Sequence, residues 1–292
     1  MGGFLTDVLM PVALGVIMLG LGLSLTVEDF RRVVSYPRAA FIGLFSQIVL
    51  LPAVAFGLAM AFGLPPELAV GLVLLAASPG GATANLFSHL AKGDVALNIT
   101  LTAINSLLAV VTMPLFVEIA LRTFMEQDKR LPLQTDKAIQ VLVIILVPVA
   151  IGMAIRAKKE GFAQRLERPV KGLSAGFLAL VILAAVLKER ANLVEYFQQV
   201  GLAALAFNLI SLAVGYLLPQ LLAVPRRQAI AVGMEIGVHN GTLAIAVATT
   251  VLGSTAIAIP AAIYSLIMFF TAAAFGWFLA RSEPDADAPA PV

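Results

Sequence analysis

The sequence has no cysteine and only two histidines in 292 residues. The lack of cysteine excludes disulfides, thiolate nucleophiles, zinc–thiolate sites and iron–sulfur clusters, and two histidines are too few for most multi-histidine metal sites. Charged residues are scarce as well: they make up 12% of the chain, and the net charge is only +2. Because nucleic-acid binding needs concentrated positive charge, we expect no nucleic-acid partner.

Hydrophobic residues instead make up 60% of the chain, and the mean hydropathy is +0.98. A soluble domain of this size cannot bury so much apolar surface. The apolar runs continue for about 20 residues, which is the length that a helix needs to cross about 30 Å of hydrocarbon. The sequence therefore predicts an all-α integral membrane protein that sits in a lipid bilayer.

We predict nine membrane-spanning helices, which lie approximately at residues 5–25, 37–62, 66–91, 94–123, 136–156, 170–189, 195–222, 226–251 and 255–281. The first helix lacks a basic leader and a clean cleavage site, so we expect it to stay in the protein. Residues 1–281 are predicted to form one transmembrane domain. Segment 282–292, rich in proline, aspartate and alanine, is predicted to be a disordered cytoplasmic tail.

The distribution of basic residues predicts the orientation. An odd number of spans places the two termini on opposite sides of the membrane. With the C-terminus in the cytoplasm, 13 of the 19 lysines and arginines lie inside and six lie outside. Because cytoplasmic loops carry the excess of basic residues, we expect the N-terminus outside.

Two of the predicted spans contain a polar, glycine-containing break, at residues 77–85 and 234–242. Proline removes a backbone donor and glycine favours non-helical angles, so each break leaves unpaired carbonyl and N–H groups. Such groups persist in hydrocarbon only where protein, water or a ligand meets them. Kinks that serve packing are one explanation. Broken helices at corresponding positions of two halves favour the binding site of a secondary transporter.

The two breaks also suggest an internal repeat. Aligning them gives two arms, at approximately 5–123 and 170–281, and leaves helix 136–156 unpaired. Five spans separate the starts of the arms, so the repeat is inverted. Segments 9–15 and 146–152 are similar as well, but they would pair different helices, and we attribute their likeness to coincidence or to shared helix packing.

Glu235 is an ionisable residue in the middle of a predicted span, where a charge costs about 2.5 to 3.5 kcal/mol and needs compensation. An ion pair with His239, four residues later, is one alternative. The other is a hard cation, which would be bound by the carboxylate, by exposed backbone carbonyls and by amides, namely at Glu235, Ile236, Val238, Gln47 and Asn85. Sodium suits these ligands better than a transition metal, because soft ligands are absent.

Further polar side chains accompany the breaks. Asn98, Thr102 and Asn105 follow the spacing i, i+4, i+7 and share one helix face. Interhelical hydrogen bonds, worth about 0.6 kcal/mol each, are the alternative to a site, and we prefer that interpretation for Asn105. For Gln47 and Asn208, packing and a site are equally good explanations.

The half-helices that follow the two breaks begin near Thr83 and near Asn240. The N-terminus of each half-helix is suited to binding an anion, because it presents free N–H groups and the positive end of the helix dipole. A substrate that carries a carboxylate is the simplest ligand for these sites. The residues expected to bind it are Thr83, Asn85, Asn240, Gly241 and Thr242. Bound sodium would raise the affinity for the anion, and the anion would raise the affinity for sodium.

Four separated motifs, at 46–52, 78–85, 90–98 and 232–240, resemble those of the bile acid:sodium symporter family, in the same order and through essentially the whole chain. The resemblance implies a core domain and a panel domain, two crossing broken helices, and two sodium sites behind the crossing. It also implies alternating access that carries organic anions inward. The chain is similar to the bacterial members, which implies a bacterial cytoplasmic (inner) membrane.

The resemblance also implies the ligands of both sodium sites, position by position. One site would comprise Ala84, Asn85, Asn98, Thr102 and Glu235, and the other Gln47, Glu235, Ile236, Val238 and His239. Three positions depart from the family's commonest pattern: Ala84 replaces a serine, Asn98 a hydroxyl residue and His239 a glutamine. Imidazole is a poor sodium ligand and titrates near neutral pH, so His239 makes the second site weaker, pH-sensitive or proton-occupied.

The sequence thus predicts a sodium-coupled symporter for a small organic anion, without a cofactor. Phe269 and Phe270 stand where bile-acid carriers place polar groups, which argues against a bile acid as substrate. A proton-coupled carrier or exporter that uses Glu235 and His239 is the alternative. An intramembrane enzyme with the same pair as acid and base is disfavoured, because no second carboxylate lies close by in sequence.

Overall fold

The computed structural model describes residues 10–125, 135–166, 169–170, 172–173, 176 and 193–281. The described part is almost entirely helical, and its elements are α2 (Met10–Ser24), α3 (Val27–Arg31), η2 (Arg32–Ser35), α4 (Pro37–Phe45), η3 (Ser46–Leu50), α5 (Leu51–Ala61), α6 (Pro66–Ala76), α7 (Ala82–Leu90), α8 (Val95–Phe124), α9 (Thr135–Lys158), α11 (Leu193–Leu221), α12 (Arg226–Gly237), α13 (Gly241–Thr250) and α14 (Thr255–Arg281). The predicted tail and most of the predicted span 170–189 lie outside the described residues.

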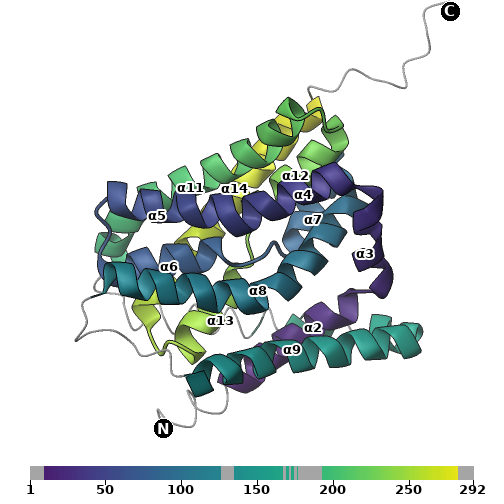
Figure 1. Ribbon diagram of the computed structural model, residues 1–292, viewed down its shortest axis with the longest axis horizontal. Helices are drawn as coiled ribbons and strands as arrows, with labels where there is room; N and C mark the ends of the chain where they lie inside the picture. The colour runs from purple at the N-terminus through teal and green to yellow at the C-terminus, as the bar shows by residue number, and fades with distance from the viewer. Residues whose placement is uncertain are drawn as a thin grey trace, which may run out of the picture.

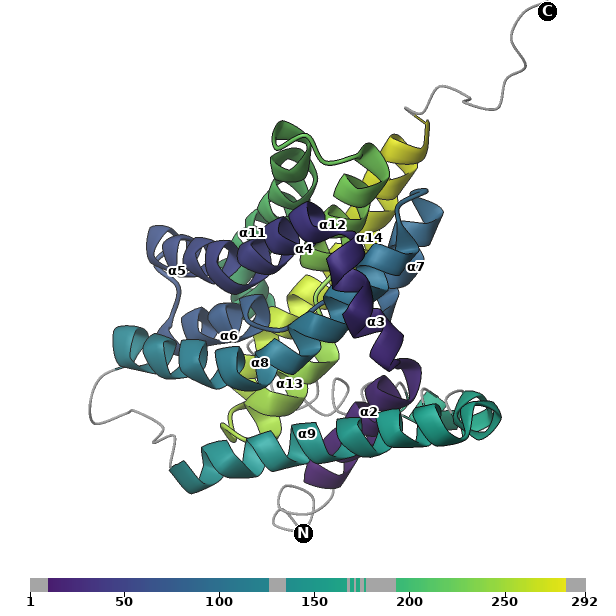
Figure 2. The same ribbon diagram turned by 45° about the vertical axis from the view of Figure 1, so that its right-hand side comes forward.

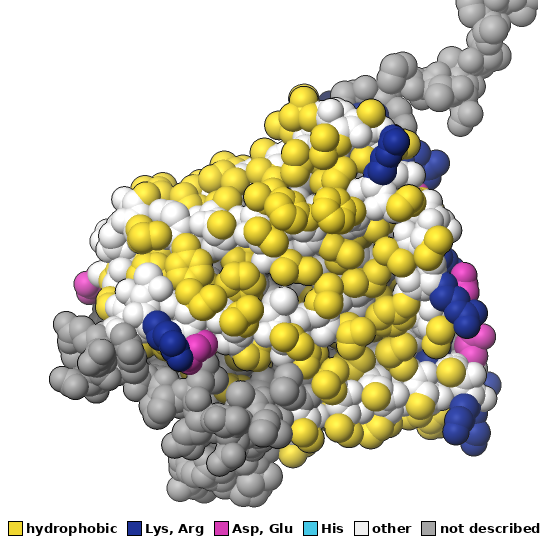
Figure 3. Space-filling view, viewed as in Figure 1, with side chains coloured by type: hydrophobic (Ala, Val, Ile, Leu, Met, Phe, Trp, Pro, Cys, Tyr) yellow, Lys and Arg dark blue, Asp and Glu magenta, His cyan; other side chains and the backbone are white. Residues whose placement is uncertain are grey.

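Four stretches of the described chain are long and apolar enough to cross a membrane: Pro37–Ala61, Val95–Phe124, Val194–Leu221 and Thr255–Arg281. Figure 3 shows a broad hydrophobic face with charged side chains toward its edges. Large apolar side chains such as Phe41 and Phe270 are mostly exposed on the surface, as expected for contact with lipid. These findings confirm the prediction of an α-helical membrane protein.

The first of these stretches is one helix made of α4, η3 and α5, and η3 is a single π-helical turn. Pro52 follows that turn and has no N–H to give to a carbonyl one turn earlier, and its ring would clash with the carbonyl of Ile48. The backbone widens there instead, and the N–H of Leu51 bonds to the Ser46 carbonyl, five residues back. The π turn carries Gln47, which is buried and points toward the neighbouring helix α6.

Both predicted breaks are confirmed. Residues 77–81 separate α6 from α7, and residues 238–240 separate α12 from α13. The two breaks also touch: Gly80 and His239 form an isolated antiparallel bridge, and the N–H of Asn240 donates to the Pro79 carbonyl at 2.7 Å. Helix α14 contacts all four half-helices and α8 contacts α6, α7 and α12, while α7 lies toward the right-hand edge of the bundle (Figures 1 and 2).

The surroundings of the two broken helices match each other. Helices α6 and α12 both start directly after a proline, Pro65 and Pro225. In each case the backbone before that proline includes a residue with left-handed φ, which is 58° at Gly63 and 57° at Ala223. The packing corresponds as well, since α6 lies against α14 and α12 lies against α8.

Helices α2 and α9 pack against each other and form a layer beside the crossed helices (Figures 1 and 2). A Cβ at Gly22 would come closer than 3.0 Å to the backbone of Val149, and one at Gly152 would come equally close to the backbone of Gly22. Small residues therefore let the two backbones touch, which is a common way to join helices in a membrane. The described part of the first of the two similar segments, residues 10–15, lies on α2 and the second, 146–152, lies on α9, and Gly15 faces Pro148 across this contact.

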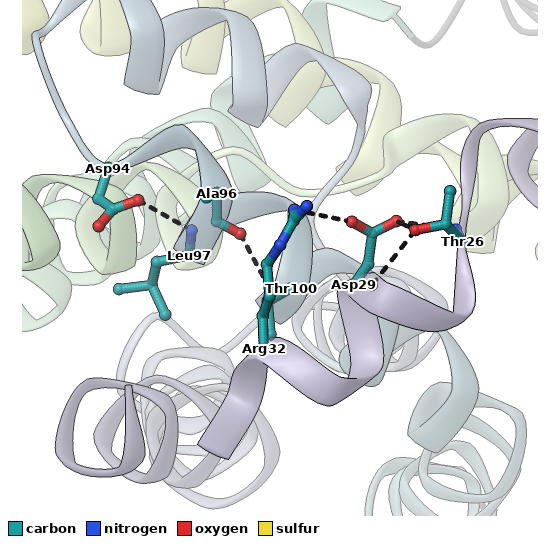
Figure 4. Close-up of polar contacts among 7 residues, drawn as sticks. All are labelled: Thr26, Asp29, Arg32, Asp94, Ala96, Leu97 and Thr100. Atoms are coloured by element: carbon teal, nitrogen blue, oxygen red, sulfur yellow. Dashed lines mark hydrogen bonds and ion pairs between the residues drawn. The ribbon is translucent and has the colours of Figure 1, made fainter. Parts of the chain in front are cut away.

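Short polar contacts fix the chain around α3 and the start of α8 (Figure 4). Thr26 and Asp29 form a capping box at the start of α3, and Arg32 donates to the Asp29 carboxylate at 3.1 Å. Asp94 caps α8 by accepting from the N–H of Leu97 at 3.1 Å. The capping box satisfies the start of α3, in the segment that joins α2 to α4, and Asp94 satisfies the start of α8, which follows α7.

Candidate functional site at the helix crossing

The carboxylate of Glu235 is completely buried where the two broken helices cross. Thr102 on α8 donates its hydroxyl to Oε2 at 2.6 Å, and Asn105, one turn further along α8, donates Nδ2 to Oε1 at 3.2 Å. The backbone N–H of Gly80, in the opposite break, donates to the same carboxylate. Segments from three parts of the chain therefore converge on one acidic group.

No positive charge meets this carboxylate within the part of the chain that the structure describes. The predicted alternative of an ion pair with His239 is not formed, because Nδ1 of His239 lies 3.1 Å from the hydroxyl of Tyr264 instead. The groups that hold Glu235 are all neutral donors, and a buried carboxylate is stable only when a cation or a proton neutralises it.

Several buried oxygen atoms near the crossing have no hydrogen-bond partner. They are amide oxygens, at Gln47 Oε1, Asn85 Oδ1, Asn98 Oδ1 and Asn105 Oδ1. Buried acceptors without a partner are rare and call for an explanation such as an ion. Oxygen ligands of this kind fit a hard cation such as sodium, so the predicted set of residues suits the ion that the family resemblance implies.

The residues predicted for the first sodium site lie on three neighbouring helices. Asn98 donates Nδ2 to the Ala231 carbonyl on α12 at 2.8 Å, which turns its free oxygen away from that contact. Thr102 lies one turn along α8 and binds Glu235 directly. Asn85 and Ala84 lie in the first turns of α7, and Ala84 is buried with only its backbone able to contact an ion.

The residues predicted for the second sodium site surround the ends of α6 and α12. Gln47 donates Nε2 to the carbonyls of Ala76 and Ser78, at 2.9 Å each, and its oxygen stays free. His239 is buried and its Nε2 has no partner. Ile236 and Val238 are both buried at the end of α12.

The sequence did not decide whether Gln47 and Asn208 serve packing or a site. In the structure, the two amides have equivalent positions. Asn208 on α11 donates Nδ2 to the Gly237 carbonyl at 2.9 Å, as Gln47 does to the carbonyls of the other break. Each amide lies 29 residues before the carbonyl it binds. The two residues therefore satisfy carbonyls that would otherwise be unpaired in hydrocarbon.

The residues predicted to bind substrate gather at the starts of α7 and α13. No side chain caps α7, and its first residues include Thr83 and Asn85, which are half-buried. Asn240 caps α13 by accepting from the N–H of Leu243 at 3.0 Å, so one of the expected free N–H groups is already bound. Gly241 follows, with no room for a side chain against Ser265.

An apolar cavity of about 310 Å³ lies beside the crossing, between the layer of α2 and α9 and the helices α8 and α13. Its lining is formed mainly by leucine, valine, methionine and alanine, and Ser106 is the one hydroxyl residue among the described lining residues. Ala103 and Ser106 each follow a residue that binds Glu235, and Leu243 belongs to the first turn of α13.

Sequence reasoning missed part of this site. Asn105 forms the interhelical hydrogen bond that we predicted for it, but the sequence did not indicate that its partner is Glu235. Gly80 was visible only as a helix breaker, whereas a Cβ there would come closer than 3.0 Å to the Glu235 carboxylate. Tyr264 gave no signal, because one tyrosine in a long apolar helix does not reveal what it faces.

Several known proteins similar to this chain are named as sodium-dependent transporters or sodium cotransporters. The sodium-dependent transporter YocS of Bacillus subtilis, named as uncharacterized, is 32% identical over 259 residues, which are 87% of this chain and 78% of YocS. BASS1 of Arabidopsis thaliana, named as a probable chloroplastic sodium/metabolite cotransporter, is 26% identical over 94% of this chain and 67% of its own length. The ileal sodium/bile acid cotransporter of Oryctolagus cuniculus is 26% identical over 80% of this chain and 67% of its own length.

A family model covers more than half of the chain. The model describes the sodium bile acid symporter family and matches residues 11–196, which include the first break and the whole of α8 with its polar face. The remaining site residues, on α12 and α13, lie within the longer alignments. The chain therefore belongs to the sodium bile acid symporter family, a family of membrane transporters and not of enzymes.

Proposed function

We propose that this protein is a sodium-coupled symporter that imports a small organic anion by alternating access. The observation that carries the proposal is Glu235, a fully buried carboxylate that only neutral donors hold, with amide oxygens around it that lack partners. A sodium ion would neutralise the carboxylate and satisfy those oxygens together. Since the relatives are named as sodium-dependent transporters, sodium is the first cation to test.

The ion would bind at two places behind the crossing. The first site would use Ala84, Asn85, Asn98, Thr102 and Glu235, and the second Gln47, Glu235, Ile236, Val238 and His239. Glu235 would belong to both sites. Sodium at one site would therefore favour the position of the Glu235 carboxylate that sodium at the other site also needs. Asn105 is a further candidate for the first site, because it contacts Glu235 and keeps a free oxygen.

The proposed architecture has nine spans arranged as an inverted repeat. The arms at approximately 5–123 and 170–281 would contribute the crossed helices of a core domain, and α2 and α9 would belong to a panel domain. The matched amides Gln47 and Asn208, the matched starts of α6 and α12, and the matched packing of α8 and α14 all support this repeat. We place the protein in a bacterial cytoplasmic membrane with its N-terminus outside, as the positive-inside rule favours.

The substrate would be an anion with an apolar body. Its carboxylate would meet the starts of α7 and α13, at Thr83, Asn85, Asn240, Gly241 and Thr242, where N–H groups and helix dipoles favour negative charge. Its hydrocarbon part would enter the adjacent cavity, whose described lining contains no charged residue.

A proton-coupled carrier is the second candidate. The observation that favours it is Nε2 of His239, a buried nitrogen without a partner close to the same crossing. The two candidates differ in the driving gradient: uptake into vesicles follows the sodium gradient in the first case and the pH gradient in the second.

The decisive experiment needs no substrate. We would measure the thermal unfolding of the purified protein in sodium and in potassium at equal ionic strength, with Glu235→Gln as the test variant and Glu118→Gln as the control. Glu118 lies on α8 too, but it is partly exposed and pairs with Arg122. Sodium at about 100 times its Kd should add about 2.7 kcal/mol of stability to the wild type and the control, and nothing to Glu235→Gln. Equal stability of the wild type in both cations would contradict the proposal.

A further inference from the structure

The apolar cavity of about 310 Å³ has walls from α2, α3, α8, α9 and α13. Apart from Ser106, every described residue that lines it is hydrophobic. Even an apolar cavity of about 150 Å³ stays free of water and binds benzene instead. The walls of an unfilled space also lose dispersion contacts, because their atoms have no partner on one side. A hydrocarbon group therefore suits this cavity better than water does.

The cavity reaches the surface of the molecule at hydrophobic side chains. Three of its lining residues are exposed, namely Val27, Leu107 and Leu146, and Val27 lies at the start of α3. Leu107 lies near the middle of α8, one of the stretches long enough to cross a membrane. Leu146 lies near the middle of α9, within the predicted span 136–156. The opening between α8 and α9 is therefore at the depth of the hydrocarbon, where lipid borders the protein.

Both helices carry a row of large exposed apolar side chains at helical spacing. On α8 these residues are Leu107, Leu108, Val111, Leu115 and Ile119. On α9 they are Val143, Leu146, Val147 and Ile151. Figure 3 shows mainly hydrophobic side chains along the described parts of this face, with charges toward its edges. Leu107 and Leu146 thus belong both to the wall of the cavity and to the surface that faces lipid.

We propose that an acyl chain of a bilayer phospholipid enters between α8 and α9 and fills this cavity when no substrate occupies it. Because Leu107 and Leu146 continue the lipid-facing surface into the cavity, the chain stays among hydrophobic side chains along the whole way. Leaving the bilayer costs it little, since lipid tails are as apolar as leucine, and filling the cavity restores the dispersion contacts of the walls.

Quenching of tryptophan fluorescence by brominated lipid tests this occupant directly. The chain has a single tryptophan, Trp277, so Trp277→Phe gives a background in which an introduced tryptophan is the only one. Met113→Trp places the reporter on the wall of the cavity, where Met113 is 2% exposed. Val111→Trp, on the outer face of α8, is the lipid-exposed control. Phe207→Trp, at a buried position outside the described lining, is the buried control.

The three proteins are compared in vesicles of phospholipid with and without bromine in the middle of the acyl chains. We expect Met113→Trp to be quenched at least half as strongly as Val111→Trp, and Phe207→Trp to be quenched least. Met18→Trp repeats the measurement from the α2 wall, in case the larger side chain disturbs α8. If neither cavity reporter is quenched more than Phe207→Trp, the proposal is overturned.

A second substitution distinguishes a chain inside the cavity from lipid outside the helix. Ala109→Phe fills the cavity one turn from Met113 on α8, where Ala109 is 3% exposed. We expect it to lower the quenching of Met113→Trp by at least half and to leave the quenching of Val111→Trp unchanged. Undiminished quenching of Met113→Trp in the Ala109→Phe protein would mean that the bromines act from outside, and it would also overturn the proposal.

This inference needs neither sodium nor a substrate, although the hydrocarbon part of the proposed substrate would use the same cavity and would displace the chain. The two ideas can therefore fail separately. Cavity reporters that lipid does not quench would reject the acyl chain and leave the sodium site and the symport proposal standing. Quenching in a protein that shows no sodium response would support the acyl chain and reject the proposed function.

Discussion

Gly80 is a residue at which the two broken helices contact each other. It forms a bridge with His239, its N–H donates to Glu235, and a Cβ on it would overlap the Glu235 carboxylate. A glycine in a helix break is usually explained by its backbone freedom. Here the lack of a side chain matters for another reason, because a single methyl group would occupy the space of the acid.

We therefore predict that Gly80→Ala destabilises the protein by about 1 to 3 kcal/mol, the usual cost of overpacking a tight site, and removes the sodium-dependent stabilisation. Gly57→Ala is the matched control, since no atom lies within 4 Å of a Cβ at that position on α5. Thermal unfolding of both variants in sodium and in potassium checks this. A Gly80→Ala variant that keeps the wild-type sodium response would contradict this prediction, because the Glu235 carboxylate would then not need its position against Gly80.

Single residues differ in how visible they are in the sequence. Glu235, Gln47 and Asn98 stand out because each is polar within an apolar run, and all three are buried near the crossing. The partner of Asn105 could not be predicted, since a polar stripe shows which residues share a helix face but not what that face meets. The same holds for Tyr264, whose contact with His239 spans 25 residues and two helices.

At the scale of elements, the two broken helices depend on amides supplied by their neighbours. Gln47 sits on a π turn, which brings its side chain to the end of α6, and Asn208 sits on the regular helix α11 facing the end of α12. The two amides bind equivalent carbonyls, but only Gln47 keeps a free oxygen, because Thr271 donates to the oxygen of Asn208. The two breaks therefore receive equivalent support from their neighbours, but only the first has beside it an amide oxygen without a partner.

This difference predicts different results for Gln47→Leu and Asn208→Leu. Both variants leave a break with fewer donors, so both should lose about 1 to 3 kcal/mol of stability. Only Gln47→Leu should also weaken sodium binding, because it alone removes an oxygen that lacks another partner. Sodium titrations of the two variants would distinguish them. Each titration is done at a temperature that lies the same number of degrees below that variant's own unfolding midpoint. Equal loss of sodium affinity in both would mean that the break geometry, not the amide oxygen, sets the affinity.

The elements themselves were predictable to different degrees. Proline and glycine mark the break at 77–81 in the sequence, and both breaks appear where expected. The π turn at Ser46–Leu50 was not predicted, because a proline in a helix is compatible with a kink, a break or a widened turn, and packing chooses among them. The contact between the two breaks depends on tertiary structure and has no local sequence signal.

At the scale of the whole molecule, the structure divides into a layer and a crossed bundle with an apolar cavity between them. Helices α2 and α9 are joined through glycine contacts, and they also contact α13 and α8, respectively. The cavity is bounded by this layer on one side and by α8 and α13 on the other. Movement of the layer relative to the bundle would change the cavity without disturbing the contacts that hold Glu235.

The cavity therefore allows substrate and sodium to be separated by mutation. Ala103→Phe would fill the cavity from α8, where Ala103 is 1% exposed and lies next to Thr102. Val111→Phe is the control, because Val111 is 67% exposed on the outer face of the same helix. We predict that Ala103→Phe lowers sodium-driven uptake of an organic anion by at least about 10-fold, corresponding to a loss of 1.4 kcal/mol in binding. The sodium-dependent thermal shift should persist in both variants.

The two measurements constrain each other. If Ala103→Phe abolishes the sodium shift together with uptake, the bulky ring has reached the ion site through Thr102, and the cavity is no independent compartment. If uptake is unchanged while the protein stays folded, the substrate does not use this cavity. Uptake lost with the sodium shift retained would instead place the anion's apolar part between the layer and the bundle, beside the residues of α8 that contact Glu235.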